Sequence, residues 1–258
     1  MKTVLVSALL LLPAAALAGS NFDGTWKTRL NSMKVTGKPD TFALQDGMYT
    51  CSSCVPEIKV KADGTDQKVS GHPYYDTIAV KVVSPTSIEV TEKKNGKLLN
   101  RSVYTLAADG KSFSGTFHDH SGAQEATGTF TEKRVAAAPA GAHAISGSWQ
   151  PDQLGEGNDA LRTVRYRMTD EQMSMQWNGQ SYEAKFDGQE YPVKNDPGGT
   201  KVSLKRVDAN TVEETDHRDG KVTDKIHMAA AADGKTIEVT DKDMLHDQVT
   251  TYTLEKQP

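Results

Sequence analysis

The two cysteines of the chain stand close together, in the segment Cys51-Ser-Ser-Cys54. Two thiols at this spacing can form a redox couple, half of a zinc site or a local disulfide. A redox couple of the thioredoxin type needs a helix amino terminus to lower the pKa of its first thiol, and no helical pattern surrounds this pair. A zinc site needs two further ligands, and there is no second cysteine pair. We therefore favour a local disulfide, with redox and metal roles as the alternatives.

Histidines and methionines supply two further candidate metal sites. On a strand, His118 and His120 of "HDHSG" would point to the same face, as in two-histidine metal sites, although a solvated strand end before a Ser-Gly turn explains them as well. Met168, Met173 and Met175 cluster in "RMTDEQMSMQW", and thioethers suit copper. Met173 and Met175 also alternate, as residues that line a strand-built core do. We favour the structural interpretation in both cases and expect no metal or other cofactor.

An aromatic loop, "GHPYYD", carries His72, Tyr74, Tyr75 and Asp76. Aromatic loops at the mouth of a barrel often contact a ligand, so these four residues are the predicted ligand-binding set. The alternative is a loop in which one tyrosine packs on the core. Both interpretations stay open from the sequence.

Motifs of known catalytic sites are missing from the chain. There is no Gly-x-Ser-x-Gly elbow, no His-Glu-x-x-His, no P-loop and no dinucleotide-binding glycine pattern. The acidic residues are scattered, and we take each as part of a solvated face. We therefore expect a protein that is not an enzyme. The formal net charge of −4 argues against a nucleic-acid partner, whose phosphates require a basic surface.

The amino terminus predicts export. Residues 1–18 combine a short basic start, an apolar run and the small-x-small end Ala16-Leu17-Ala18, which is the pattern of a cleaved signal peptide. The run is too short for a membrane span, and no second apolar run is long enough for one. Cleavage near Ala18 would place the mature chain in a periplasmic or extracellular space, where neighbouring cysteines are usually bridged.

An internal repeat organises the rest of the chain. With a shift of 124 residues, 61–114 aligns on 185–238 without a gap, and about 16 of 54 positions are identical. The openings "FDGTW" and "ISGSW" also correspond, as do the ends "TFTEK" and "YTLEK". Small residues and one proline at 135–144 indicate a linker. We predict a first domain at 19–134 and a second at 145–258.

Each copy shows the pattern of an antiparallel meander. Alternating runs such as "IKVKADG" and "SIEVTEKKNGK" end in Asp-Gly or Asn-Gly, which suit tight hairpin turns. The fold class we predict is all-β, with two tandem up-and-down barrels. In the repeat, Cys51–Cys54 falls on 175–178, just before an Asn-Gly turn, so the cysteines should flank a hairpin tip. The loop at 71–76 falls on "NDPGGT", so the first copy could have a role that the second lacks.

The start of each copy carries a resemblance. Gly24 and Trp26 in the first copy, and Gly147 and Trp149 in the second, stand just ahead of the meander. This arrangement resembles the lipocalin and fatty-acid-binding-protein superfamily, and two-copy secreted bacterial lipocalin-like proteins within it. The resemblance implies that the tryptophans plug the closed ends of barrels whose open ends admit a small apolar ligand. In that superfamily an arginine near the last strand packs on the tryptophan. Arg134 could take that part in the first copy, whereas the second copy ends "LEKQP" without an arginine.

These observations lead to one functional hypothesis and two alternatives. The hypothesis is an exported, monomeric, non-catalytic protein that binds a small apolar molecule in one or both barrels. The first alternative is an interaction module that recognises a protein or envelope partner through its loops, with Tyr74 and Tyr75 as contacts. The second is handling of copper or zinc through His118, His120 or the methionines.

Overall fold

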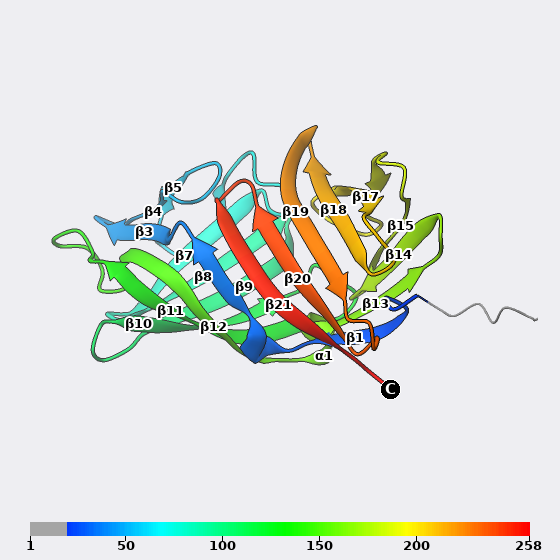
Figure 1. Ribbon diagram of the computed structural model, residues 1–258. Helices are drawn as coiled ribbons and strands as arrows, with labels where there is room; N and C mark the ends of the chain where they lie inside the picture. The colour runs from blue at the N-terminus through cyan, green and yellow to red at the C-terminus, as the bar shows by residue number, and fades with distance from the viewer. Residues whose placement is uncertain (1–19) are drawn as a thin grey trace, which may run out of the picture.

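The computed structural model describes residues 20–258, so the expected signal peptide at 1–18 lies outside the described residues. The chain forms two antiparallel, nearly closed β-barrels that lie side by side (Figure 1). This confirms the predicted all-β fold with tandem barrels. No helix within residues 20–258 is long and apolar enough to cross a membrane.

The first barrel is a sheet of ten strands in the order β5-β4-β3-β12-β11-β10-β9-β8-β7-β6. An isolated bridge between Asp63 and Lys81 brings its two edges together. Its strands are β3 (Asp40–Gln45), β4 (Met48–Cys51), β5 (Ile58–Lys61), β6 (Gln67–Lys68), β7 (Thr77–Ser84), β8 (Ser87–Lys94), β9 (Lys97–Leu106), β10 (Ser112–Asp119), β11 (Ala126–Ala136) and β12 (Gly147–Gly157).

The second barrel is a sheet in the order β15-β14-β13-β1-β21-β20-β19-β18-β17-β16, with β2 paired to β21 beside this path. A bridge between Ser181 and Lys194 brings its edges together. Its strands are β1 (Gly24–Thr28), β2 (Lys34–Gly37), β13 (Thr163–Met168), β14 (Gln172–Trp177), β15 (Gln180–Lys185), β16 (Tyr191–Pro192), β17 (Lys201–Arg206), β18 (Thr211–Arg218), β19 (Lys221–Ala230), β20 (Thr236–Asp243) and β21 (Gln248–Lys256). Two short helical turns complete the chain, η1 (Leu30–Ser32) and α1 (Asp159–Arg162).

The first strands of the two copies are exchanged between the barrels. Strand β1 lies between β13 and β21, with Trp26 opposite Val164 and Lys256. Strand β12 lies between β11 and β3, with Trp149 opposite Arg134 and Asp40. Figure 1 shows β1, in blue, in the barrel formed by the yellow-to-red half of the chain. The sheets therefore do not follow the expected division into 19–134 and 145–258.

Connection length explains the exchange. Strands β11 and β12 follow each other in the sequence, and consecutive strands joined by a short connection usually pair. Residues 137–146 thus serve as a hairpin loop on the first barrel, where the backbone N–H of His143 donates to the carbonyl of Leu44. Pairing of β12 here leaves the equivalent place beside β21 open. Strand β1 fills it, because it carries the same Gly-x-Trp pattern.

Each exchanged tryptophan is fully buried in the barrel that its strand enters. The indole N–H of Trp26 donates to the carbonyl of Phe22 at 2.8 Å, and that of Trp149 donates to Ile145 at 3.0 Å. The Arg134 guanidinium lies 4.0 Å from the centroid of the Trp149 ring. In the second barrel the ammonium of Lys256 takes the equivalent place, 5.3 Å from the Trp26 ring. Lys256 thus takes the role in the second barrel that Arg134 has in the first. Each of these two cations lies on the last strand of a copy, β21 or β11, which pairs with the strand that carries the tryptophan.

Because each barrel contains a strand from the other half, the exchange predicts that cutting the linker will not separate the halves. A recognition sequence for a site-specific protease, inserted between Ala138 and Gly141, allows a clean cut. We expect the cut chain to elute from a size-exclusion column at the volume of the uncut insertion variant, and to separate only in denaturant. Two fragments eluting apart in native buffer would contradict the exchange.

Candidate ligand-binding cavities

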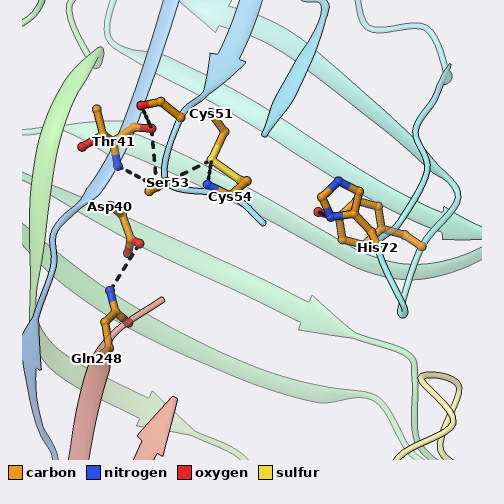
Figure 2. The surroundings of a disulfide bond; sticks show 9 residues. Asp40, Thr41, Cys51, Ser53, Cys54, His72 and Gln248 are labelled. Carbon is orange, nitrogen blue, oxygen red and sulfur yellow. Dashed lines mark hydrogen bonds between the residues drawn. A yellow bond between two sulfur atoms is a disulfide. The ribbon is translucent and has the colours of Figure 1, made fainter. Parts of the chain in front are cut away.

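The cysteine pair forms the expected disulfide. The sulfur atoms of Cys51 and Cys54 lie 2.06 Å apart, at the start of the turn between β4 and β5 (Figure 2). Cys51 ends β4 opposite Ile58, so Cys54 lies within the turn and the pair does not flank its tip. The hydroxyl of Ser53 accepts from the backbone N–H of Thr41 at 2.8 Å, which fastens this turn to β3.

The four candidate residues of the loop at 71–76 do not all have the same role. The rings of His72 and Tyr75 stack with centroids 4.8 Å apart, and Nδ1 of His72 lies 3.2 Å from the Tyr75 hydroxyl. Tyr75 packs against the core of the first barrel. The Asp76 carboxylate accepts from the backbone N–H of Asn95 at 2.8 Å, which ties the loop to the β8–β9 turn. His72 and Asp76 thus position the loop, and Tyr75 is aimed inward.

Tyr74 instead reaches the second barrel. Its hydroxyl lies 3.4 Å from that of Thr200, and the guanidinium of Arg218 lies 5.0 Å from its ring centroid. A Cβ added at Gly198 would lie 2.7 Å from the ring, so the glycine of "NDPGGT" makes room for this tyrosine. Lys94 donates to the carbonyls of Pro73 and Pro197, two prolines that correspond in the repeat. The difference between the two loops therefore makes their surfaces complementary.

A cavity of about 510 Å³ occupies the interior of the first barrel at this junction. Tyr74 and Tyr75 line it, whereas His72 and Asp76 do not. Its remaining aromatic side chains are Phe117 and Phe130 of the first barrel and Trp177 of the second. Three of the polar side chains that line it are Glu92, Asn100 and Ser102. The volume, and a lining that combines five aromatic side chains with polar groups, are those of a small-molecule site.

Glu92 is one of three carboxyl groups that line this cavity, together with Asp119 and Asp196. Its carboxylate accepts from the side-chain amide of Asn100 at 3.2 Å. Burial raises the pKa of Glu92, and the negative charge of Asp119 adds to the increase. The carboxyl group can therefore donate or accept a hydrogen bond beside an otherwise apolar ligand.

A second cavity of about 510 Å³ occupies the interior of the second barrel. Trp177 lines this cavity as well as the first, and its indole N–H donates to the carbonyl of Leu161 at 3.2 Å. The wall carries three carboxyl groups, from Glu214, Asp216 and Asp241. The barrels are thus both hollow, and the lining of each cavity includes three carboxyl groups.

A smaller cavity of about 170 Å³ lies beside the disulfide. Glu132 lines it and is only 8% exposed, and its Oε2 atom makes no hydrogen bond. Burial raises the pKa of Glu132 to about 8, and repulsion from Asp40 adds to the increase. Asp40 also accepts from the side chain of Gln248, which comes from the second barrel (Figure 2). Two carboxyl groups therefore share the core of the first barrel at this point.

The metal candidates are partly brought together. The imidazoles of His118 and His120 both face the Glu125 carboxylate, with His118 Nδ1 bonded to it and His120 Nε2 at 4.0 Å. Among residues 20–258, no group of three or more histidine, cysteine, aspartate or glutamate side chains is placed to hold a metal ion. Met168 and Met173 are buried in the core of the second barrel, and Met175 packs against that core.

The buried acidic residues are what the sequence analysis missed. The sequence predicts Glu92, Glu132 and Glu214 on solvated faces, yet each side chain lines a barrel interior. Strand parity is the signal that could have found two of them. In "TVEETDHR", Glu214 lies two residues after Val212 and therefore on the same face of the strand. In "SIEVTEKK", Glu92 lies two residues after Val90 and shares its face in the same way.

Comparisons with known proteins give no relative for this chain: no family model, no curated protein and no solved structure matches it. The two nearly closed barrels are compatible with a lipocalin-like double barrel.

The raised pKa of Glu132 predicts a pH-dependent effect of Glu132→Gln. The folded chain holds a proton there up to a pH of about 8, while the unfolded chain releases it near the ordinary value of 4.5. The free energy of unfolding of the native sequence should therefore fall as pH rises between these values. The glutamine of the variant does not titrate. The free energy of unfolding of the variant, relative to that of the native sequence, should therefore rise by up to about 4 kcal/mol between pH 4 and pH 9.

Urea unfolding curves at several pH values measure this difference. Glu156→Gln is the control, since Glu156 is exposed and should give a difference close to zero throughout. If the difference in free energy of unfolding between Glu132→Gln and the native chain stays constant with pH, Glu132 titrates as an ordinary carboxyl group and the prediction is wrong.

Proposed function

We propose that the chain is an exported, non-catalytic protein that binds a small, mainly apolar molecule in the interior of the first barrel. The observation that carries this proposal is the cavity of about 510 Å³ lined by five aromatic side chains. The Gly-x-Trp openings and the buried tryptophans support a relation to the lipocalin superfamily, in which the barrel interior holds the ligand.

Side-chain packing in the first barrel supports the proposal. A barrel can fill its interior with side chains. One end of the first barrel is filled in this way by Phe42, Phe113 and Tyr104. Further along β9, at Ser102 and Asn100, the inward residues are small or polar, and the interior of the barrel stays open. Residues of the second barrel, among them Trp177, cover this opening. Burial of an apolar ligand there removes both the ligand and the aromatic rings from water.

The two alternatives have less support in the described residues. Tyr74 packs against the second barrel and is therefore already occupied within the chain, which weighs against its recognition of an external partner. His118 and His120 share a single carboxylate, Glu125, and no further ligand accompanies them in the described part of the chain.

Binding of N-phenyl-1-naphthylamine tests the proposal. This neutral aromatic fluorophore brightens when it leaves water, and we expect it to bind the purified chain and to quench Trp177. Ser102→Phe places a ring in the cavity and should weaken binding at least tenfold. Asn100→Phe fills the same space from a less buried position and should do the same, which keeps the test valid if one variant folds poorly.

Thr105→Phe is the matched control, because Thr105 lies on the same strand with its side chain exposed. Its binding should stay within about twofold of the native chain. If the fluorophore does not bind, or if both cavity-filling variants bind as tightly as the native chain, the proposal is wrong.

A further inference from the structure

The interior of the second barrel carries an unusual set of carboxyl groups. Asp216 on β18 lies directly opposite Asp224 on β19, which in turn lies opposite Asp243 on β20. Two residues along the strands, Glu214 and Asp241 share a second row on the same face. Like charges that face each other across antiparallel strands destabilise a sheet. Five acidic side chains on neighbouring inward positions therefore require an explanation.

Two of the five have cationic neighbours. A guanidinium nitrogen of Arg218 lies 3.7 Å from Asp224, and Nδ1 of His246 lies 2.6 Å from Asp243. These pairs leave Glu214, Asp216 and Asp241 without a salt-bridge partner among residues 20–258, and these three are the carboxyls that line the cavity.

Glu214 is buried and Asp216 and Asp241 are half-buried, and each aspartate has one oxygen without a hydrogen bond. Glu214 is 8% exposed, and one of its oxygens accepts from the Tyr182 hydroxyl at 2.6 Å. One Oδ1 atom of Asp216 and one of Asp241 are buried without a hydrogen bond. Buried acceptors without a donor cost free energy, so a ligand that donates to them or carries a positive charge would be stabilised there.

The cavity walls suit the apolar body of such a ligand. Tyr166, Tyr182, Tyr252 and Trp177 line it, and the faces of aromatic rings attract cations. Among residues 20–258, Arg162 is the only basic side chain on the wall, and its guanidinium donates to the carbonyl of Thr28. The cavity thus combines aromatic faces with carboxyl groups, and its one basic side chain is engaged with the backbone.

The first barrel shows that the fold does not require Glu214 and Asp241. By strand register, Glu214 corresponds to Val90 and Asp241 to Phe117, while Asp216 corresponds to Glu92. The first barrel therefore closes with apolar side chains at two of the three positions. Glu214 and Asp241 therefore belong to the second cavity in particular and are not required by the architecture.

We propose that the second barrel binds an organic cation, a protonated or quaternary amine with an apolar body, against Glu214, Asp216 and Asp241. This goes beyond the proposed function of the first barrel and does not rest on it. The cation supplies the charge that the three carboxyls lack, and the aromatic walls enclose its apolar part.

Cation binding should release protons. Burial raises the pKa of Glu214, and repulsion from Asp241 and Asp224 adds to the increase. Burial raises the pKa of Asp216, with repulsion from Glu214 adding to it, and burial raises the pKa of Asp241 to about 6. The other titratable or charged groups that face them or line the same cavity are Tyr166, Tyr182, Tyr252, Asp224, Asp243, Arg162 and Arg218. A positive ligand favours the ionised carboxyls, so the pKa values fall on binding and the affinity should rise with pH.

Benzyltrimethylammonium and its carbon isostere, neopentylbenzene, test the proposal on the full chain. The two molecules have the same shape and differ in charge, and neither titrates. We follow Trp177 emission at pH 8 and expect the cation to bind at least tenfold more tightly than the isostere. Calorimetry in two buffers of different ionisation enthalpy should show net proton release from the protein.

The double variant D216N/D241N should weaken cation binding at least tenfold and leave the isostere within about twofold. It removes repulsion between buried groups, so we expect it to fold. The matched control E213Q/E238Q removes two outward-facing carboxyls from the same strands, β18 and β20, and should bind as the native chain does.

Three results would overturn the proposal. The first is equal affinity for the cation and the isostere, or no binding of either molecule. The second is native affinity in D216N/D241N. The third is loss of cation binding in E92Q, which would assign the cation to the first barrel.

Discussion

The exchange of the two tryptophan-bearing strands is the constraint on which the rest of the structure depends. Strand β12 completes the first barrel and β1 completes the second, so neither half of the chain contains its whole barrel. Each buried indole lies in the barrel that the other copy mostly builds. The cation that covers the indole comes from the copy that builds that barrel. Separation of the barrels would therefore break sheet hydrogen bonds and open both cores.

This constraint also fixes how the barrels face each other. With their first strands exchanged, the loops at 71–76 and 195–200 meet, and Tyr74 occupies the space left by Gly198. Trp177 is held where it lines both cavities. The first cavity is thus covered by residues of the second barrel, and its shape depends on the exchange.

The sequence predicts the local features of this fold well. The Asn-Gly and Asp-Gly turns adopt the expected positive φ angles, as at Asn178 and Gly179, because few other residues tolerate them. The disulfide follows from the spacing of two lone cysteines. The repeat predicts two barrels, but it cannot assign β1 and β12, since strands of equal pattern fit either place equally well. That choice depends on the geometry of the linker and of the neighbouring strands.

The candidate sites are predicted less completely, for a related reason. Tyr74 and Tyr75 do line a cavity, yet His72 and Asp76 support the loop from outside it. An acidic residue in an alternating strand is ordinarily solvated, so Glu132 and Asp216 stand out only when the inward face of each strand is known. The repeat adds one useful comparison, because Val90 and Phe117 in one copy show that Glu214 and Asp241 in the other are not needed for packing.

Cross-linking of engineered cysteine pairs tests the strand exchange most directly. Thr25 lies opposite Arg165 in the exchanged arrangement, whereas it would lie opposite Thr41 if β1 took the place of β12, where Ser148 now stands. Under mild oxidation, the exchange predicts a disulfide in the variant T25C/R165C and none in T25C/T41C. Efficient cross-linking of T25C/T41C, with none in T25C/R165C, would contradict it.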